Sequence, residues 1–312
     1  MKLLIGVYYS REEPLCLFSK PLEARGKIPH NGGMKKIFLL LVLCAVPVLT
    51  QAAFHEAEAQ QEGWEILPHN RPFPLVVADT REIRTALRPN SRNELEAEVG
   101  SYRSFMGWKG NFHDEAIVTH FGLEGNGYYI MRHQGSRFPL VSTDGLIGLY
   151  FEAAQKNAAV QVRYTHISAH LSDDGIKAGR STIQYSREFL HLRYAKMFSF
   201  FGEAFAYLGY QYLTNTDPHD IPKHGADFGF YSLFTPISAH LRPYFGADYK
   251  IRNTHEGSTF DLTTGLALLS SQAPHGAPPI RFGFHYLQGH DPRGQFYGEH
   301  RKKFSGGLEM DL

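Results

Sequence analysis

The chain has 312 residues and is nearly neutral, with 32 Lys and Arg against 31 Asp and Glu, 23 Phe, 17 Tyr, 30 Gly and only 2 Cys. This composition excludes an intrinsically disordered chain, a disulfide scaffold and a polybasic nucleic-acid binder. Only one apolar run approaches the length of a membrane-spanning helix, which excludes a multi-helix membrane protein but not a β-barrel, whose strands need only alternate.

The apolar run spans residues 37–49 and follows the basic stretch Met34-Lys35-Lys36. A basic start, about 13 apolar residues and small residues at a cleavage point are typical of a secretory signal peptide, which we place at residues 34–52. Residues 1–33 are then an upstream extension that precedes the true initiator. The alternatives are a genuine long leader, a membrane anchor at 37–49 or a lipoprotein acylated at Cys44.

Residues 53–93 are polar and interrupted by four prolines, which predicts a periplasmic lead-in with no long helix or strand. From residue 94 to 312 the pattern is alternation of polar and apolar residues. It is clearest at 240–252, where Arg242, Asp248 and Lys250 share one face of the predicted strand. Strands are expected to begin near residues 95, 115, 127, 144, 158, 181, 201, 225, 240, 259, 280 and 304, although 115 and 127 can also belong to one long strand.

We interpret this pattern as an all-β, antiparallel transmembrane β-barrel of 10–12 strands, with a non-barrel N-terminal lead-in. The export signal, strands of about 9–11 residues and an alternation of short and long connections all favour a barrel in the bacterial outer membrane. Outer-membrane lipids are the expected partners, and the barrel assembly machinery is expected to insert the chain. The sequence predicts no nucleic-acid partner and leaves the oligomeric state open.

The segment 160–174 contains the residues best suited to chemistry. Residues two apart in a strand share a face, so His166, Ser168 and His170 line up on the apolar, lipid-facing side, while Gln161 and Arg163 face the lumen. A serine hydroxyl becomes a nucleophile when an imidazole takes its proton and a third group orients that imidazole. The His-x-Ser pattern therefore predicts a base and a nucleophile within reach of each other.

The next strand offers the third group, because Ser186 and Glu188 lie on its apolar face by parity. Pairing Ser168 with Glu188 would centre the hairpin near Ala178 and let Glu188 orient His166. His170 and Ser186 are the alternates for base and nucleophile. The competing interpretation is that these side chains sit at headgroup level in a structural or binding role.

Asp173 and Asp174 follow in the predicted loop. Two carboxylates can hold a Ca²⁺ ion together with lipid oxygens, or they can simply form a turn. No other cofactor is required by the sequence, which has no P-loop, no dinucleotide-binding glycine pattern and no zinc-type Cys/His spacing.

Several short segments resemble an uncharacterised bacterial family known as domain of unknown function 1207. They are residues 63–68 (GWEILP), 73–82 (FPLVVADTRE), 142–148 (STDGLIG), 166–174 (HISAHLSDD), 185–188 (YSRE) and 291–297 (DPRGQFY). The resemblance covers about residues 62–312. It implies an exported outer-membrane barrel and brings no assigned activity.

The pattern His166-x-Ser168, with Glu188 on the neighbouring strand, is also similar to outer-membrane phospholipase A and lipid A 3-O-deacylase. Both are barrel hydrolases of lipid esters. The resemblance implies that His166 is the base, Ser168 the nucleophile and Glu188 the orienting group. Ala169 and His170 stand where the phospholipase pattern has Asn-Gly, which leaves the stabiliser of the oxyanion unassigned.

Three hypotheses follow from the sequence. The first is an outer-membrane barrel of unassigned role that acts as a lipid-ester hydrolase on phospholipid or lipid A. The second is a non-enzymatic barrel, either a small pore or an envelope structural protein, whose lumen carries charges such as Arg163, Arg187, Arg193, Lys250 and Arg252. The third is a soluble periplasmic β-barrel that binds an apolar ligand.

Overall fold

The computed structural model describes residues 62–219, 221–252, 257–268 and 280–311. The proposed signal peptide and upstream extension lie outside these residues. The described chain forms one antiparallel sheet of 13 strands with two short helices, α2 (Asp173–Lys177) and the 3₁₀ helix η1 (Gly294–Phe296). The strands are β1 (Gly63–Ile66), β2 (Thr85–Pro89), β3 (Glu94–Phe112), β4 (Glu115–Arg132), β5 (Leu140–Gln155), β6 (Ala158–Leu171), β7 (Tyr185–Ser199), β8 (Gly202–Asp217), β9 (His224–Phe234), β10 (Leu241–Arg252), β11 (Ser258–Leu268), β12 (Ile280–His290) and β13 (His300–Met310).

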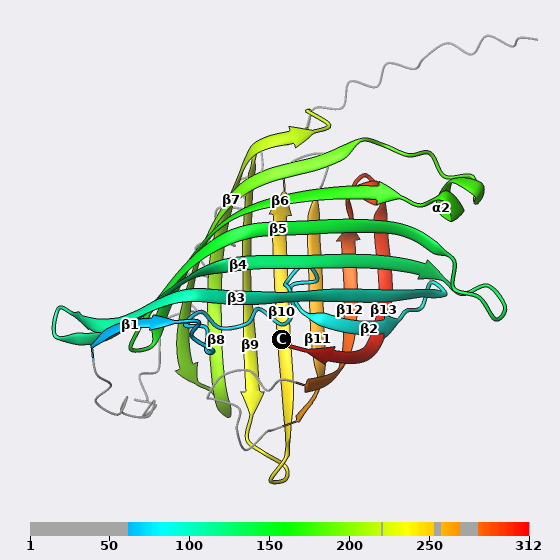
Figure 1. Ribbon diagram of the computed structural model, residues 1–312. Helices are drawn as coiled ribbons and strands as arrows, with labels where there is room; N and C mark the ends of the chain where they lie inside the picture. The colour runs from blue at the N-terminus through cyan, green and yellow to red at the C-terminus, as the bar shows by residue number, and fades with distance from the viewer. Residues whose placement is uncertain (1–61, 220, 253–256, 269–279, 312) are drawn as a thin grey trace, which may run out of the picture. The chain divides into compact units, whose positions relative to one another are not determined.

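Strands β2 to β13 close into a twelve-stranded barrel. Consecutive strands pair with each other, and the short strand β2 joins the last strand β13 to β3. Figure 1 shows the long strands β3 to β6 crossing in front of β9 to β13, as strongly tilted strands of a closed barrel do. Strand β1 is an addition that pairs with the second half of β3. The expectation of an all-β antiparallel barrel with about twelve strands is therefore confirmed.

The structure decides one alternative that the sequence left open, and it adds one strand that the sequence did not predict. The strands expected near residues 115 and 127 are one continuous strand, β4, because Gly122, Gly125 and Gly127 stay in register with β5 and do not break the ladder. Residues 85–89, expected to belong to the lead-in, form β2 and take part in closure. A strand of five residues that ends in proline carries too little alternation to be found from the sequence.

Several connections at one end of the barrel are shorter than those at the other, although the β11–β12 and β2–β3 connections do not follow this rule. At one end, named here the turn end, residues 113–114, 156–157 and 200–201 each join two strands in a tight turn. His113 and Asp114 both have positive φ, as a type I′ hairpin turn requires. At the other end, named here the loop end, the longer connections 133–139, 172–184 and 291–299 join the strands.

The wall of the barrel has an apolar outer face and a polar inner face. Large apolar side chains are exposed on the outside along β4 to β13, among them Ile147, Leu192, Leu208, Phe284 and Phe304. Charged side chains are instead buried in the lumen, and alternate positions of the same strands supply both sets. No helix in the described part of the chain has both the length and the apolar character to cross a lipid bilayer.

The inner positions of the wall are as the sequence predicted. Gln161, Arg163 and Thr165 of β6 are buried in the lumen, as are Arg193 of β7 and Lys250 of β10. Successive side chains of a strand point to opposite faces. Because these residues face the lumen, the residues between them face outward.

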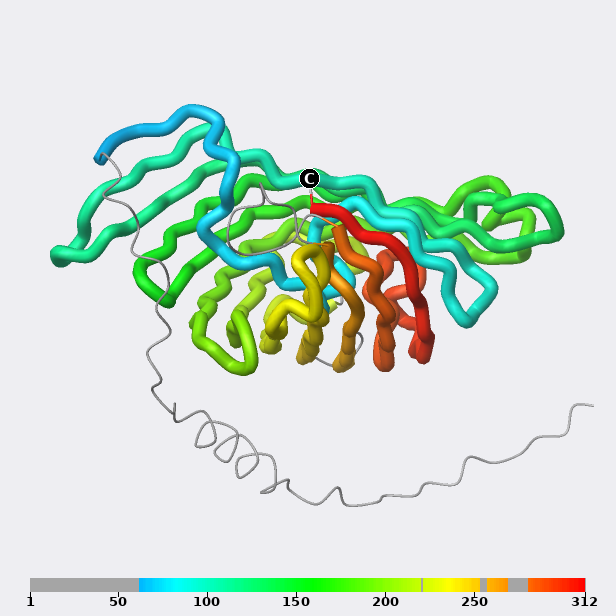
Figure 2. Tube along the Cα trace, turned by 90° about the horizontal axis from the view of Figure 1, so that it is seen from below, coloured from blue at the N-terminus to red at the C-terminus, as the bar shows by residue number. Residues whose placement is uncertain are grey.

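The lumen is occupied by residues 71–84, named here the plug segment, which connect β1 to β2. In Figure 2 this N-terminal stretch, in blue, passes between the green strands on one side and the yellow to red strands on the other. Phe73, Val76 and Val77 of the plug segment pack in one buried cluster with residues of β6 to β11. A segment that the composition marks as a polar lead-in thus forms part of the core.

The seam where the barrel closes is held by a single carboxylate that contacts four cationic or ionisable groups. Glu309 of β13 lies 2.6 Å from Arg88 of β2, 3.3 Å from Arg84 of the plug segment, 3.4 Å from Arg281 and 2.7 Å from His285 of β12. All of these side chains are buried. Removing one partner from a buried ion pair leaves uncompensated charge, which is costly.

We expect Glu309→Gln to lower the free energy of unfolding of the barrel by about 3–5 kcal/mol, because Arg84, Arg88 and Arg281 each lose one of their two carboxylate partners in a buried site. Urea unfolding of the detergent-refolded protein, followed by heat-modifiable gel migration, measures the change. Glu299→Gln is the matched control. Glu299 also pairs with two arginines, at 2.9 and 3.1 Å, but is 44% exposed, so we expect a loss of about 1 kcal/mol or less. Equal losses in the two variants would contradict this account of the seam.

Candidate functional site

The outer face of β6 and β7 holds the polar cluster that the sequence singled out. Antiparallel pairing places His166 directly opposite Glu188 and Ser168 opposite Ser186. The Nδ1 atom of His166 lies 3.5 Å from Oε1 of Glu188, and both side chains are partly exposed, at 43% and 36%. An imidazole held through Nδ1 by a carboxylate presents Nε2 to its other neighbours, which is the arrangement of a base and its orienting group.

Ser168 lies two residues beyond His166 on the same face, beside open space. Its neighbour on β5 is Gly145, and its neighbour on β7 is the small Ser186. A Cβ atom placed on Gly145 would meet only the Oγ atom of Ser168, at 3.8 Å. Within the described residues the Ser168 hydroxyl makes no side-chain hydrogen bond. The hydroxyl is therefore accessible from outside, over a shallow floor of small residues.

Glu188 has a second partner on the same face. The hydroxyl of Tyr164 donates to its Oε2 atom at 3.3 Å, while Oε1 faces His166. Tyr164 precedes His166 by two positions on β6, so both side chains point to the outer face. There the hydroxyl of Tyr164 and the imidazole of His166 contact different oxygens of the Glu188 carboxylate. The pair of contacts fixes the carboxylate between a donor and the imidazole.

The register of the β6–β7 hairpin corrects one expectation. The sequence interpretation paired Ser168 with Glu188, whereas Glu188 pairs with His166. The shift is an even number of residues, so every side chain keeps its face. The loop that joins the two strands contains the helical turn α2, whose N-terminus is capped by Ser172. The change brings Glu188 closer to the proposed base and further from the proposed nucleophile.

The remaining candidates lie apart from this pair. His170 is exposed and pairs with Thr143 of β5, one step nearer the loop end. Asp173 and Asp174 form the first turn of α2, and Asp174 contacts Lys177 at 3.8 Å. Across the described residues no three His, Cys, Asp or Glu side chains gather in a way that would hold a metal ion.

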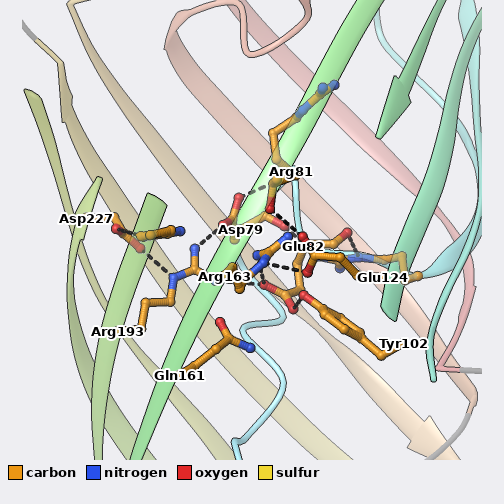
Figure 3. Close-up of polar contacts among 12 residues, drawn as sticks. Asp79, Arg81, Glu82, Tyr102, Glu124, Gln161, Arg163, Arg193 and Asp227 are labelled. Carbon is orange, nitrogen blue, oxygen red and sulfur yellow. Dashed lines mark hydrogen bonds and ion pairs between the residues drawn. The ribbon is translucent and has the colours of Figure 1, made fainter. Parts of the chain in front are cut away.

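The lumen carries a second and larger polar cluster, which joins the plug segment to the wall (Figure 3). Arg193 of β7 is its centre, with carboxylate oxygens of Asp79 at 2.5 Å, Glu82 at 2.9 Å and Asp227 at 2.9 Å. Asp79 also contacts Lys250 at 2.7 Å. Asp79 is thus shared by cations from β7 and β10, and Glu82 binds the same arginine of β7.

Further contacts extend this cluster around the lumen. Arg81 of the plug segment reaches Asp144 of β5 at 3.0 Å, and the hydroxyl of Tyr102 donates to Glu82 at 2.6 Å. Arg163 of β6 lies 2.7 Å from Glu124 of β4. The plug segment is therefore fixed to walls on several sides by charge-assisted contacts.

The ionisation of the plug segment depends on these contacts. Burial of the Asp79 carboxyl by itself favours the neutral form, but Lys250 and Arg193 outweigh burial and hold the pKa of Asp79 well below its usual range. Asp79 therefore stays charged at neutral pH and binds the cations of the wall.

The plug segment is the feature that sequence reasoning missed. Its signal was present, because residues 73–82 supply one of the segments that resemble the family. The segment has neither the alternation of a strand nor the periodicity of a helix. Its two valines, Val76 and Val77, are followed by charged residues, a pattern that predicts a polar connection. Only the opposite charges on β5, β7 and β10 show where it belongs.

A comparison of the sequence with family profiles decides the relationship. The profile described as "Protein of unknown function (DUF1207)" matches residues 53–309. The chain belongs to the DUF1207 family. The match begins before the plug segment and ends in β13, so the family unit contains both the barrel and its lumenal segment. No curated protein matches the sequence.

Among solved structures, this DUF1207 protein is similar to outer membrane phospholipase A from Escherichia coli. The TM-score is 0.47 and the sequence identity 13%, over 78% of this chain and 94% of that chain. The outer membrane phospholipase dimer of Salmonella typhi with bound calcium has a TM-score of 0.47 and 11% identity, over the same shares of the two chains. The resemblance to the DUF1207 family is confirmed, and the phospholipase resemblance is found again among the solved structures.

We expect Asp79→Asn to destabilise the barrel by about 3 kcal/mol at pH 7, because buried Lys250 and Arg193 lose a carboxylate partner. The folded pKa of Asp79 is depressed, so its contribution is fully present above the unfolded value of about 3.9 and is lost as the pH falls through the folded pKa. The gap between wild type and variant should stay constant from pH 7 to pH 5 and narrow only in strong acid.

Urea unfolding at a series of pH values measures this gap. Asp114→Asn, in an exposed turn at the turn end, is the matched control and should leave stability unchanged. A gap that widens on acidification would contradict the assignment of a depressed pKa to Asp79.

We expect the purified barrel to show no steady conductance in planar bilayers, because charge-assisted contacts tie the plug segment to opposite walls of the lumen. The double variant Asp79→Asn with Glu82→Gln removes the carboxylates that Arg193 shares with the plug segment, and should open a conducting path. Stable single-channel steps in the wild-type protein would show that the lumen is an open pore.

Proposed function

We propose that this DUF1207 protein is an outer-membrane β-barrel that hydrolyses lipid esters, with Ser168 as nucleophile, His166 as base and Glu188 as the orienting group. The observation that carries the proposal is the 3.5 Å contact between His166 and Glu188 on the outer wall, with Ser168 next on the same face. Polar groups that lose water on an apolar surface are costly unless they are paired, and the contact between His166 and Glu188 is such a pair.

The distribution of side chains supports a place in a membrane. A closed barrel with an exposed apolar outer face is stable in a lipid environment. In water, the same surface would be unfavourable. Short turns at one end and longer loops at the other are typical of outer-membrane barrels, with the turns on the periplasmic side. The charged lumen also argues against a soluble barrel that holds an apolar ligand.

The position of the cluster along the wall supports a role at the outer leaflet. His166 and Ser168 are the ninth and eleventh of the 14 residues of β6 and lie nearer the loop end than the turn end. His224, whose ring nitrogen lies 2.6 Å from the hydroxyl of Tyr210 on the outside of the wall, is the first residue of β9 and lies at the loop end. Tyrosine and histidine side chains with one apolar and one polar end favour the membrane interface. The proposed nucleophile would then face the ester bonds of the outer leaflet.

The reaction we propose is acyl transfer to water. The Oγ atom of Ser168 attacks the ester carbonyl carbon while its proton passes to His166, and the protonated imidazole then gives that proton to the departing alkoxide. Water attacks the resulting acyl-serine with His166 again as base, which releases the fatty acid and restores the hydroxyl. Glu188 stabilises the imidazolium that forms in both halves.

We expect Ser168→Ala to lower fatty-acid release by about 10³-fold or more, because the acyl-enzyme can no longer form. Glu188→Gln keeps the shape of the side chain but not its charge, and should lower the rate by about 10²–10⁴-fold. Release is measured on phospholipid and on lipid A in mixed micelles, with and without added Ca²⁺, using the refolded full chain.

Ser186→Ala is the matched control, since Ser186 is a serine on the same outer face directly across from Ser168. It should retain wild-type activity. Absence of hydrolysis by the wild-type protein on both lipids, or full activity of folded Ser168→Ala, would remove the proposed function and leave the non-enzymatic barrel.

A further inference from the structure

Strand β1 lies outside the ring of twelve strands, beside the part of β3 that leads to the β3–β4 turn. It pairs with residues 106–109 of β3, and among the described strands β3 is its only neighbour. Figure 1 shows the β3–β4 hairpin, with β1 beside it, extending to the left beyond the neighbouring strands. We name β1 and residues 106–121 the turn-end extension.

One face of the turn-end extension is apolar and aromatic. Trp64 of β1 lies directly opposite Trp108 of β3, and Ile66 lies opposite Met106. Trp64 is 72% exposed and Ile66 is 82% exposed. The indole ring of Trp108 lies so close to Gly110 that a Cβ atom at that position would clash with it. Exposed apolar surface of this kind marks contact with a membrane or with another protein.

The opposite face of the same strands is polar. Glu65 and Lys109 form an ion pair at 2.9 Å, and Asn111 donates a hydrogen bond to Glu62, which directly precedes β1. Neighbouring residues of a strand point to opposite faces, so Glu65 lies on the face away from Trp64. The turn-end extension is therefore amphipathic.

The apolar face of the turn-end extension is continuous with the outer wall of the barrel. Residues that pair directly across two strands share a face. Met106 pairs with Phe121 of β4, and Phe121 pairs with Phe151 of β5, which is exposed on the outside of the wall. Aromatic side chains also gather at another turn of the same end, where Phe200 and Phe201 are both exposed. The surroundings of the outer wall therefore also reach the turn-end extension.

We propose that the apolar face of the turn-end extension binds phospholipid, with Trp64 and Trp108 at the boundary between headgroups and acyl chains. The proposal rests on the membrane location proposed above. Tryptophan favours this boundary because its ring is apolar and its N–H group needs a polar partner. In the proposed orientation the turn end lies on the periplasmic side, so the lipid belongs to the periplasmic leaflet.

The free edge of β1 sets the depth of this contact. Because β1 has a neighbour on one side only among the described strands, the backbone groups on its other edge need water or polar lipid groups. The hydrocarbon of a bilayer offers no such partners, whereas the headgroup region does. Glu65 and Lys109 on the polar face are also partly exposed and remain in contact with water. The turn-end extension therefore lies in the headgroup region and not across the hydrocarbon.

Tryptophan fluorescence of the refolded full chain in phosphatidylcholine vesicles tests the proposal, because Trp64 and Trp108 are the only tryptophans in the sequence. Trp64→Phe and Trp108→Phe each leave one tryptophan as the probe and keep an aromatic ring at the changed position. We expect lipid brominated close to its ester groups to lower the emission of each probe by about twofold, and lipid brominated at its chain ends to lower it much less. Iodide in the water should quench each probe less than in the urea-unfolded protein.

A charge added to each face gives the matched pair of variants. In the Trp108→Phe background, Ile66→Glu puts a charge beside Trp64 on the apolar face, and should shift its emission to longer wavelength and weaken quenching by the brominated lipid. Asn111→Lys adds a charge to the polar face instead, next to Glu62, and should leave the emission and the quenching unchanged.

The possible outcomes separate this proposal from the membrane location on which it rests. In protein that floats with the vesicles, quenching by iodide without quenching by either brominated lipid would overturn the lipid contact and leave the membrane barrel intact. Protection from all quenchers would assign the face to a second copy of the chain, and stronger quenching from the chain ends would contradict the headgroup depth. Folded protein that does not enter vesicles would overturn the membrane location itself. None of these outcomes depends on hydrolytic activity.

Discussion

Pairing of charge inside a space shielded from bulk water is the constraint on which this structure depends. The lumen contains many buried arginines, lysines and carboxylates, and each costs several kcal/mol to desolvate unless it is compensated. The single side chain of Arg193, for example, forms ion pairs with carboxylates of both the plug segment and β9. The plug segment therefore supplies carboxylates that neutralise buried cations of the wall, in addition to filling the lumen. The outer face can then be largely apolar, because most of the charged side chains of the strands lie on the lumenal side.

Strands β6 and β7 show how one pair of strands serves two environments. Alternate residues of β6, His166 and Ser168, face outward, while Ile167 between them is buried on the lumenal side. On β7, Glu188 faces outward and Arg187 is buried in the lumen. The period of two in a strand thus separates the outer polar cluster from the lumenal charges, although their residues are neighbours in the chain.

The sequence correctly predicted which face of the wall each strand residue occupies, because this depends only on the alternation of side chains along a strand. Alternation placed His166, Ser168 and Glu188 outward and Arg163, Arg193 and Lys250 inward, because a strand offers only two faces. Register was harder to predict, since it depends on how many residues the β6–β7 loop uses in α2, and the expected partner of Glu188 was wrong by one pair of residues. The plug segment has no periodicity at all. Its place is set by charges that are distant in sequence, which local patterns do not contain.

The closing seam also affects how fast the molecule can fold. Arg84 and Glu309 are 225 positions apart in the chain, so their contact joins the two ends of the described barrel across almost its whole length. Contacts of such high sequence separation carry the loop-closure entropy of the chain between them and slow folding. The seam therefore makes this barrel a fold of high contact order, and we expect it to refold more slowly than a barrel closed by local hairpins alone.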